Sequence, residues 1–186
     1  MRKMMPIGPL MIEHRLIERM IDVMRHELDR TSRDHTVDRA FIETVVDFIR
    51  TYADRCHHGK EEDILFRELK KKNLSAELSQ IMSELIEEHK WGRATTKKLV
   101  EGANMYEAGN VEQGYSIVID SLSELVEFYP KHIEKEDKHF FLPVMQFFSQ
   151  AEKDTMLQEG FEFDQKLIHA LYRGKVEQEE QRRMSS

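Results

Sequence analysis

Apolar residues recur along the chain at intervals of three or four, the spacing of one face of an α-helix. The first apolar stripe begins at Leu10 and ends at a polar break over residues 31–34. Further stripes cover about 37–72, then from Ser75 to about 109, and then onward to Pro143. Ser75 is a residue type that caps helix N-termini. The pattern therefore predicts four long helices joined by short connections.

Four such helices predict an all-α fold, an up-down-up-down four-helix bundle. We expect its core over about residues 9–149. A further amphipathic segment over about 151–173 predicts an additional C-terminal helix, packed outside the bundle or across one end. The expected organisation is one domain over 1–174, followed by a polar, frayed tail over 175–186.

Each of the four predicted stripes carries one histidine: His14, His57, His89 or His132. The first two are 43 residues apart, and so are the last two, so the halves are related by a shift of 75. Under this shift LMIEHR meets LIEEHK, and HHGKEEDILF meets HIEKEDKHFF. The similarity is concentrated on segments that carry His and Glu. This concentration indicates a shared site rather than a shared core.

The stretch HHGKEEDILF leaves two choices for an inward pair at i, i+4, His57 with Glu61 or His58 with Glu62. His58 aligns with an isoleucine in the second half, whereas His57 and Glu61 align with His132 and Glu136. We therefore predict His57, Glu61, His132 and Glu136 as the inward residues. His58, Glu62 and Asp137 are expected to be solvated or to orient a ligand imidazole.

Helix lengths predict that these side chains meet in one layer. His14 and His57 lie about 16 and 20 residues from the first turn, or roughly 24 and 30 Å along antiparallel helices. Burying four imidazoles and two carboxylates is costly unless a metal binds them. Six ligands are too many for one tetrahedral zinc ion. Imidazole with carboxylate suits two iron ions, with manganese or zinc as substitutes.

These segments resemble the hemerythrin-like (HHE cation-binding) family over about residues 10–145. HHGKEEDILF and HIEKED are similar to that family's second and fourth helices, and EEHKWGR to its third. The resemblance implies a four-helix bundle that holds a non-haem diiron centre, oxo- or hydroxo-bridged, with the two glutamates between the irons. The ligands that it implies are His14, His57, Glu61, His89, His132 and Glu136.

The sequence departs from the oxygen-carrying members of that family. They carry His-x-x-x-His on the third helix, but here His89 is followed at i+4 by Arg93. They also use His-x-x-x-x-Asp on the fourth helix. Asp137 keeps that option open, although the internal repeat favours Glu136. We therefore expect about two histidines per iron, and binding of O2 or NO in sensing, iron handling or oxidative and nitrosative stress rather than oxygen carriage.

Two other functions remain open. A diiron enzyme of the oxidase or NO reductase type would turn over with an electron donor, supplied by a redox partner protein. The other is a metal-free helical interaction module, since a lone histidine on an apolar stripe is usually a core residue. Iron would change neither the spectrum nor the stability of such a module. Four at matched intervals favour a metal site.

Composition narrows the remaining classes. Charged residues make up 34% of the chain and the net charge is −7, which disfavours nucleic acid and anionic membranes as partners. The single cysteine, Cys56, suits a reducing compartment, and the apolar stretch at the N-terminus is too short for a signal peptide or membrane span, so we expect a cytoplasmic protein. Cys56 precedes a ligand by one residue and is expected to pack facing away from the site. Tyr129 lies one turn before His132 and is expected in the core, with a hydrogen bond to a metal-bound oxygen as the alternative. The remaining histidines are expected at the surface or at helix ends: His26, His35, His139 and His169.

Overall fold

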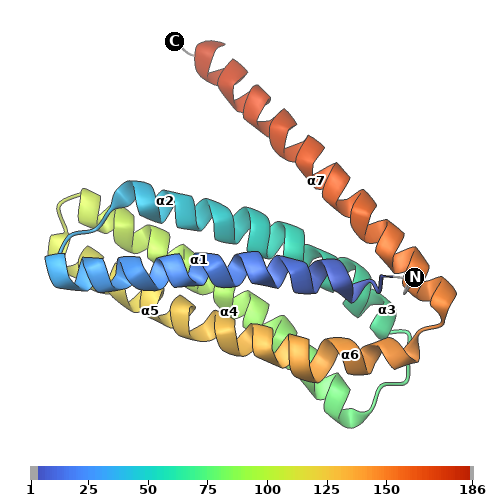
Figure 1. Ribbon diagram of the computed structural model, residues 1–186. Coiled ribbons are helices and arrows are strands. Elements are labelled where there is room, and N and C mark those ends of the chain that lie inside the picture. Colours follow the sequence, from blue (N-terminus) through green and yellow to red (C-terminus); the bar gives the residue numbers. More distant parts are fainter. Residues whose placement is uncertain (1–3, 185–186) are drawn as a thin grey trace.

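The computed structural model describes residues 4–184, and the surroundings of side chains up to residue 168 and at 171. Four long helical rods run antiparallel in up-down-up-down order (Figure 1). The first is α1 (Ile7–Asp34), and the third is α4 (Ala76–Glu107). The second rod consists of α2 (Arg39–Phe48), η1 (Ile49–His58), η2 (Glu61–Phe66) and α3 (Arg67–Leu69). The fourth consists of α5 (Val111–Lys135), η3 (Glu136–Phe140), α6 (Phe141–Val144) and η4 (Met145–Phe147). Residues 4–184 contain no β-strand, so the all-α bundle prediction is confirmed.

The rods begin and end where local chemistry favours it. Ser75 caps α4, because its hydroxyl accepts a hydrogen bond from the Leu78 N–H, as the sequence predicted. The Asp38 carboxylate accepts from the Phe41 N–H and caps the second rod in the same way. Gly109, with φ of +90°, supplies the left-handed turn between α4 and α5. These short turns keep neighbouring rods antiparallel.

Buried apolar side chains form two separate clusters along the bundle. One includes Ile21, Leu99 and Leu122, and the other includes Phe66 and Phe140. Each such side chain stabilises the fold by about 1.5–3 kcal/mol relative to exposure. In every rod the predicted histidine lies in sequence between residues of the two clusters. The apolar clusters therefore enclose a polar layer and offset the cost of burying it.

Three segments of the second and fourth rods, η1, η2 and η3, are π-helical. A π-helix closes its hydrogen bonds over five residues instead of four, so its turn is wider, and such segments are frequent at functional sites. His57 and His58 end η1, Glu61 begins η2, and Glu136 begins η3. The wider turns therefore occur where the second and fourth rods enter the polar layer.

The additional helix α7 (Gln150–Met184) starts at the end of the bundle near α6, and its C-terminal end stands clear of the rods (Figure 1). A capping box begins it, in which Ser149 and Glu152 each accept from the other's backbone N–H. The backbone of α7 is helical beyond the predicted limit of 173, because residues 175–184 are rich in Glu, Gln and Arg, which are good helix formers.

α7 packs against η1 and η2 of the second rod. The fit is close at Gly59, where an added Cβ would lie 2.8 Å from Cζ of Phe163.

The assignment of 1–174 to one domain with a polar tail stays a prediction. Within the described part of the chain, no helix combines the length and the apolarity needed to cross a bilayer.

Candidate metal centre

The structure brings the six predicted residues into one buried layer. The histidines come from α1, η1, α4 and α5, and the glutamates from η2 and η3. None of these six side chains is more than 2% exposed: His14, His57, Glu61, His89, His132 and Glu136. Every rod of the bundle therefore contributes at least one imidazole or carboxylate to the layer.

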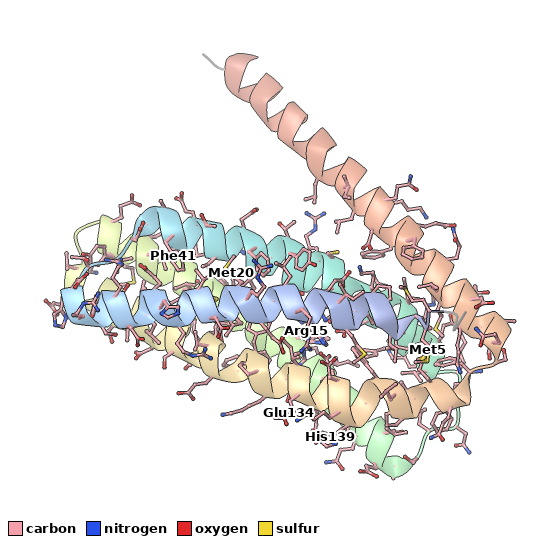
Figure 2. The ribbon with its side chains drawn as sticks, viewed as in Figure 1. Met5, Arg15, Met20, Phe41, Glu134 and His139 are labelled. Atoms are coloured by element: carbon pink, nitrogen blue, oxygen red, sulfur yellow. The ribbon has the colours of Figure 1, made fainter. Side chains whose placement is uncertain are left out.

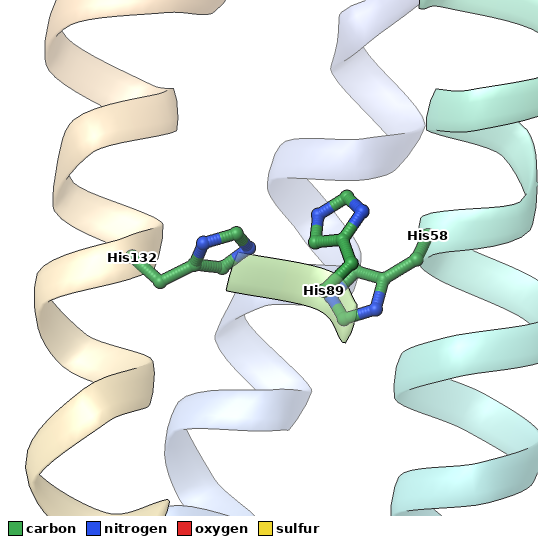
Figure 3. Close-up of side chains that lie close together, drawn as sticks. All are labelled: His58, His89 and His132. Carbon is green, nitrogen blue, oxygen red and sulfur yellow. The ribbon is translucent and has the colours of Figure 1, made fainter. Parts of the chain in front are cut away.

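A seventh residue, His58, joins this layer, although the sequence had indicated a solvated or supporting role for it. His58 is 3% exposed, and its ring stacks on that of His89 with 3.9 Å between centroids. Figure 3 shows the rings of His58, His89 and His132 directed toward one another from three different rods. In an α-helix consecutive residues point about 100° apart, so the helical period does not predict that His57 and His58 share a narrow inward face. The wider π-helical turn of η1 brings both inward.

The seven residues divide into two groups, each with candidate ligand atoms within 4.8 Å of one another. The first group is His14, His57, Glu61 and Glu136, and the second is His58, His89 and His132. Both carboxylates also reach the second group. Glu61 lies with one oxygen 3.4 Å from Nε2 of His57 and the other 3.4 Å from Nε2 of His89. Glu136 lies 3.1 Å from Nε2 of His14 and 3.3 Å from Nε2 of His132. Each carboxylate thus directs one oxygen to each group.

Four of the imidazoles are oriented by a carboxylate on their outer side, which accepts a hydrogen bond from Nδ1. His14 donates to Asp137 at 2.8 Å and His57 to Glu13 at 2.9 Å. His89 donates to Glu62 at 2.7 Å and His132 to Glu88 at 2.8 Å. Because an ionised carboxylate only accepts, Nδ1 carries the proton in these contacts, and Nε2 is the nitrogen left to bind a metal once the ring is neutral. The predicted orienting role of Glu62 and Asp137 agrees with these contacts.

Each outer carboxylate is paired in turn with a cation. Arg15 binds Asp137, Lys60 binds Glu13, Arg93 binds Glu62, and Lys135 binds Glu88. Arg15 lies on the flank of α1 (Figure 2), and only the lysine at position 60 is deeply buried. Burial alone would raise the pKa of Glu13, Glu62 and Glu88, but the paired imidazole and cation lower each below its usual value. These three glutamates therefore stay ionised as acceptors.

The inner atoms of the layer have no such partners. Nε2 of His14, His57, His89 and His132, and all four oxygens of Glu61 and Glu136, are buried without a hydrogen bond among the described residues. Leaving buried polar atoms unpaired costs on the order of 1–3 kcal/mol each, more for charged groups. Burial lowers the pKa of His57 to about 4 and keeps that imidazole neutral, the form that binds a metal. Bare imidazole nitrogens facing carboxylate oxygens fit a transition-metal site.

A cavity of about 130 Å³ opens beside the second group. His58, His89 and Tyr129 line its buried part, and the exposed side chains of Arg50 and Arg93 line it as well. Tyr129 is 2% exposed, and burial raises the pKa of its phenol, so the hydroxyl stays protonated. The cavity gives the second group an approach from the surface, and Tyr129 lines it while packing in the core as expected.

The residues expected elsewhere lie outside the layer. His26, His35 and His139 are exposed, and Figure 2 shows His139 with Glu134 on the outer side of the fourth rod. His169 lies outside the described side chains. Cys56 is half-buried and donates to Asp164 of α7 at 3.3 Å, and burial raises the pKa of its thiol to about 12. The thiol therefore faces α7 and takes no part in the layer.

One comparison with known proteins found a family match over the part of the chain that contains this layer. The family model described as "Hemerythrin HHE cation binding domain" matches residues 5–144. That range covers the residues of both ligand groups and their outer carboxylates, and it ends before α7 begins. Neither the curated proteins nor the solved structures include a match to the chain.

Proposed function

Because the chain belongs to the hemerythrin HHE cation-binding family, we propose that it binds two iron ions in this layer and a small diatomic molecule, O2 or NO, beside them. The proposal assigns His14 and His57 to one ion and His58, His89 and His132 to the other, with Glu61 and Glu136 between them. The observation that carries it is the set of bare, buried Nε2 and carboxylate oxygen atoms. Cations would satisfy all of these atoms at once.

Two ions account for the donors better than one. Five imidazoles and two carboxylates exceed the four ligands of a tetrahedral zinc site. Both carboxylates direct one oxygen to each group, the arrangement that a shared pair of cations requires. Imidazole and carboxylate together suit iron, with manganese or zinc as substitutes. Bound iron would supply open coordination positions and redox chemistry.

His58 changes the expected symmetry of the centre. With three imidazoles in one group and two in the other, the sites differ, whereas the sequence predicted about two histidines for each. The additional imidazole comes from the second rod. In the oxygen-carrying relatives we expect it to come from the third rod instead. We retain sensing, iron handling or a response to oxidative or nitrosative stress as the proposed role, in a reducing, cytoplasmic setting.

The cavity beside His58 and His89 supports a diatomic ligand. Its volume of about 130 Å³ admits a molecule of a few atoms, since a water molecule occupies about 30 Å³ in the liquid. Tyr129 lines it with a protonated hydroxyl, a hydrogen-bond donor for a ligand oxygen or nitrogen. The chain's own residues thus provide entry and one polar contact.

Anaerobic titration of the metal-free protein with ferrous iron tests this proposal. We expect about two irons per chain by metal analysis, and a change in the optical spectrum after O2 or NO is added. His132→Ala should lose bound iron, whereas His139→Ala, an exposed histidine on the same rod, should retain it. A single tightly bound ion, with the second site empty in excess iron, would overturn the two-iron centre.

A further inference from the structure

Three ion pairs fasten α7 to the second rod and to the turn that follows it. Lys72 binds Glu152 at 2.5 Å, Arg67 binds Glu159 at 2.7 Å, and Lys60 binds Asp164 at 2.6 Å. The three acidic partners follow one another along α7. Only the last pair continues toward the candidate metal centre, because Lys60 also binds Glu13, which accepts from His57.

The internal repeat provides a second copy of this arrangement for comparison. The 75-residue shift maps Lys60, Glu13 and His57 onto Lys135, Glu88 and His132, and the same contacts recur there. The two lysines differ in their second carboxylate partner and in their exposure. The second partner of Lys135 is Glu84 of α4, at 3.1 Å, and its side chain is 27% exposed. The second partner of Lys60 is Asp164 of α7, and its side chain is 5% exposed.

Because Lys60 is buried, loss of its contact with Asp164 should cost more than loss of the Lys135 contact with Glu84. A buried ammonium that loses one of two carboxylates is left poorly compensated, whereas water can replace the partner of an exposed lysine. The Cys56 thiol also donates to Asp164, and Phe163 fits tightly over Gly59. α7 is therefore seated directly on the residues that support His57.

We propose that Lys60 and Asp164 are positioning residues for His57, acting through Glu13, so that docking of α7 and occupancy of the metal centre are coupled. The coupling rests on the proposed function, because it requires that His57 bind a metal. Linkage makes it reciprocal: if docked α7 favours the metal-ready orientation of His57, metal binding favours docked α7 by the same factor. Docking of α7, the helix that lies beyond the family match, therefore depends on whether the centre holds metal.

Hydrogen exchange of the full-length protein with and without ferrous iron tests the coupling. In the unmodified protein we expect iron to slow amide exchange over residues 150–168 of α7. Asp164→Asn should abolish that slowing and weaken iron affinity about threefold to tenfold, less than the 10–100-fold typical when a group that directly contacts a ligand is lost. It should also alter the iron absorption spectrum.

Two control variants separate coupling from simple loss of contacts. Glu159→Gln removes the Arg67 pair, so it should speed exchange of α7 while leaving the iron-dependent slowing in place. Glu84→Gln removes the equivalent partner of Lys135, so it should leave exchange of α7 unchanged. Equal exchange of α7 with and without iron, in protein that binds two irons, would overturn the coupling and leave the proposed function standing. Because that comparison needs no variant, it holds even if Asp164→Asn fails to fold. Failure of the unmodified protein to bind iron would overturn both.

Discussion

The two halves of the bundle place equivalent residues in equivalent positions, yet they are not equally enclosed. His57 and His132 each donate to a glutamate that is held by a lysine, and the two sets are related by the 75-residue shift. In the first half α7 covers the lysine, and in the second half the lysine is partly exposed. The first half also carries His58, where the second has Ile133. The shared residues form the polar layer, and the departures from symmetry provide its fifth imidazole and its contact with α7.

Iron should stabilise both halves at once, which is the largest effect expected. Iron that binds only the folded state stabilises it by about 4 kcal/mol at a thousandfold excess over its dissociation constant. We expect the melting temperature to rise by several degrees at pH 7.5 and much less at pH 5.5. Matched thermal melts with and without iron at the two pH values measure this difference.

The sign of that pH dependence follows from the histidines. Burial lowers the pKa of His14, but Asp137 and Glu136 outweigh burial and raise it to about 9, so iron must displace a proton there, and does so less readily as pH falls. Burial lowers the pKa of His57 to about 4, so between about pH 6.5 and 4 this residue binds more protons in the unfolded chain than in the folded one. The contribution of His57 to the stability of the metal-free protein is therefore lost as pH falls through that window. Identical melts with and without iron at pH 7.5 would return the layer to a metal-free interpretation.

Glu61 and Glu136, which each direct one oxygen to each group, provide the next largest effect and a direct test of the symmetry. Glu61→Ala and Glu136→Ala remove equivalent residues, and each deprives both groups of one oxygen. We expect each variant to weaken iron binding by more than about 100-fold, the upper end for loss of an outer partner. Metal analysis after gel filtration measures it. Glu134→Ala, at an exposed position of the same rod as Glu136, is the control. A large loss from only one of the two variants would break the symmetry.

Much of the fold was predictable because helical periodicity is local. The four stripes, the Ser75 cap and the inward direction of His14 and His89 all follow from spacing within a single helix. His58 did not follow, because the π-helical turn that directs it inward has no signal in an α-helical period.

The outer carboxylates were a different case, since their pairing crosses between rods. Glu13 is the neighbour of His14 in sequence but accepts from His57, and Glu88 is the neighbour of His89 but accepts from His132. The 75-residue shift relates Glu13 to Glu88 and Glu62 to Asp137, so the repeat held a signal for these residues. The contact of Asp164 with Lys60 had no such signal, because α7 has no counterpart in the repeat.

His58 and Ile133 sharpen the comparison, because they occupy equivalent positions with different chemistry. His58→Ala should weaken binding of one of the two irons by about 10–100-fold and change the absorption spectrum. Ile133→Ala removes a core side chain that is 3% exposed, so it should cost about 2–5 kcal/mol of unfolding free energy while retaining two irons. Iron titration and urea denaturation of both variants separate the two effects. An unchanged spectrum in His58→Ala would restore the supporting role that the sequence predicted.

The smallest effect concerns the cavity, which only the second group adjoins. Tyr129→Phe keeps the ring in the core and removes the hydroxyl that lines the cavity beside His58 and His89. A hydrogen bond contributes about 0.5–1.5 kcal/mol, so NO should bind the iron-loaded variant roughly twofold to tenfold more weakly. Tyr52→Phe is the matched control, because Tyr52 stacks on Phe48 and is not among the residues that line this cavity. The affinities follow from optical titration with NO under anaerobic conditions. Equal affinities in the two variants would mean that Tyr129 serves the core alone, and that the cavity guides the ligand by its shape.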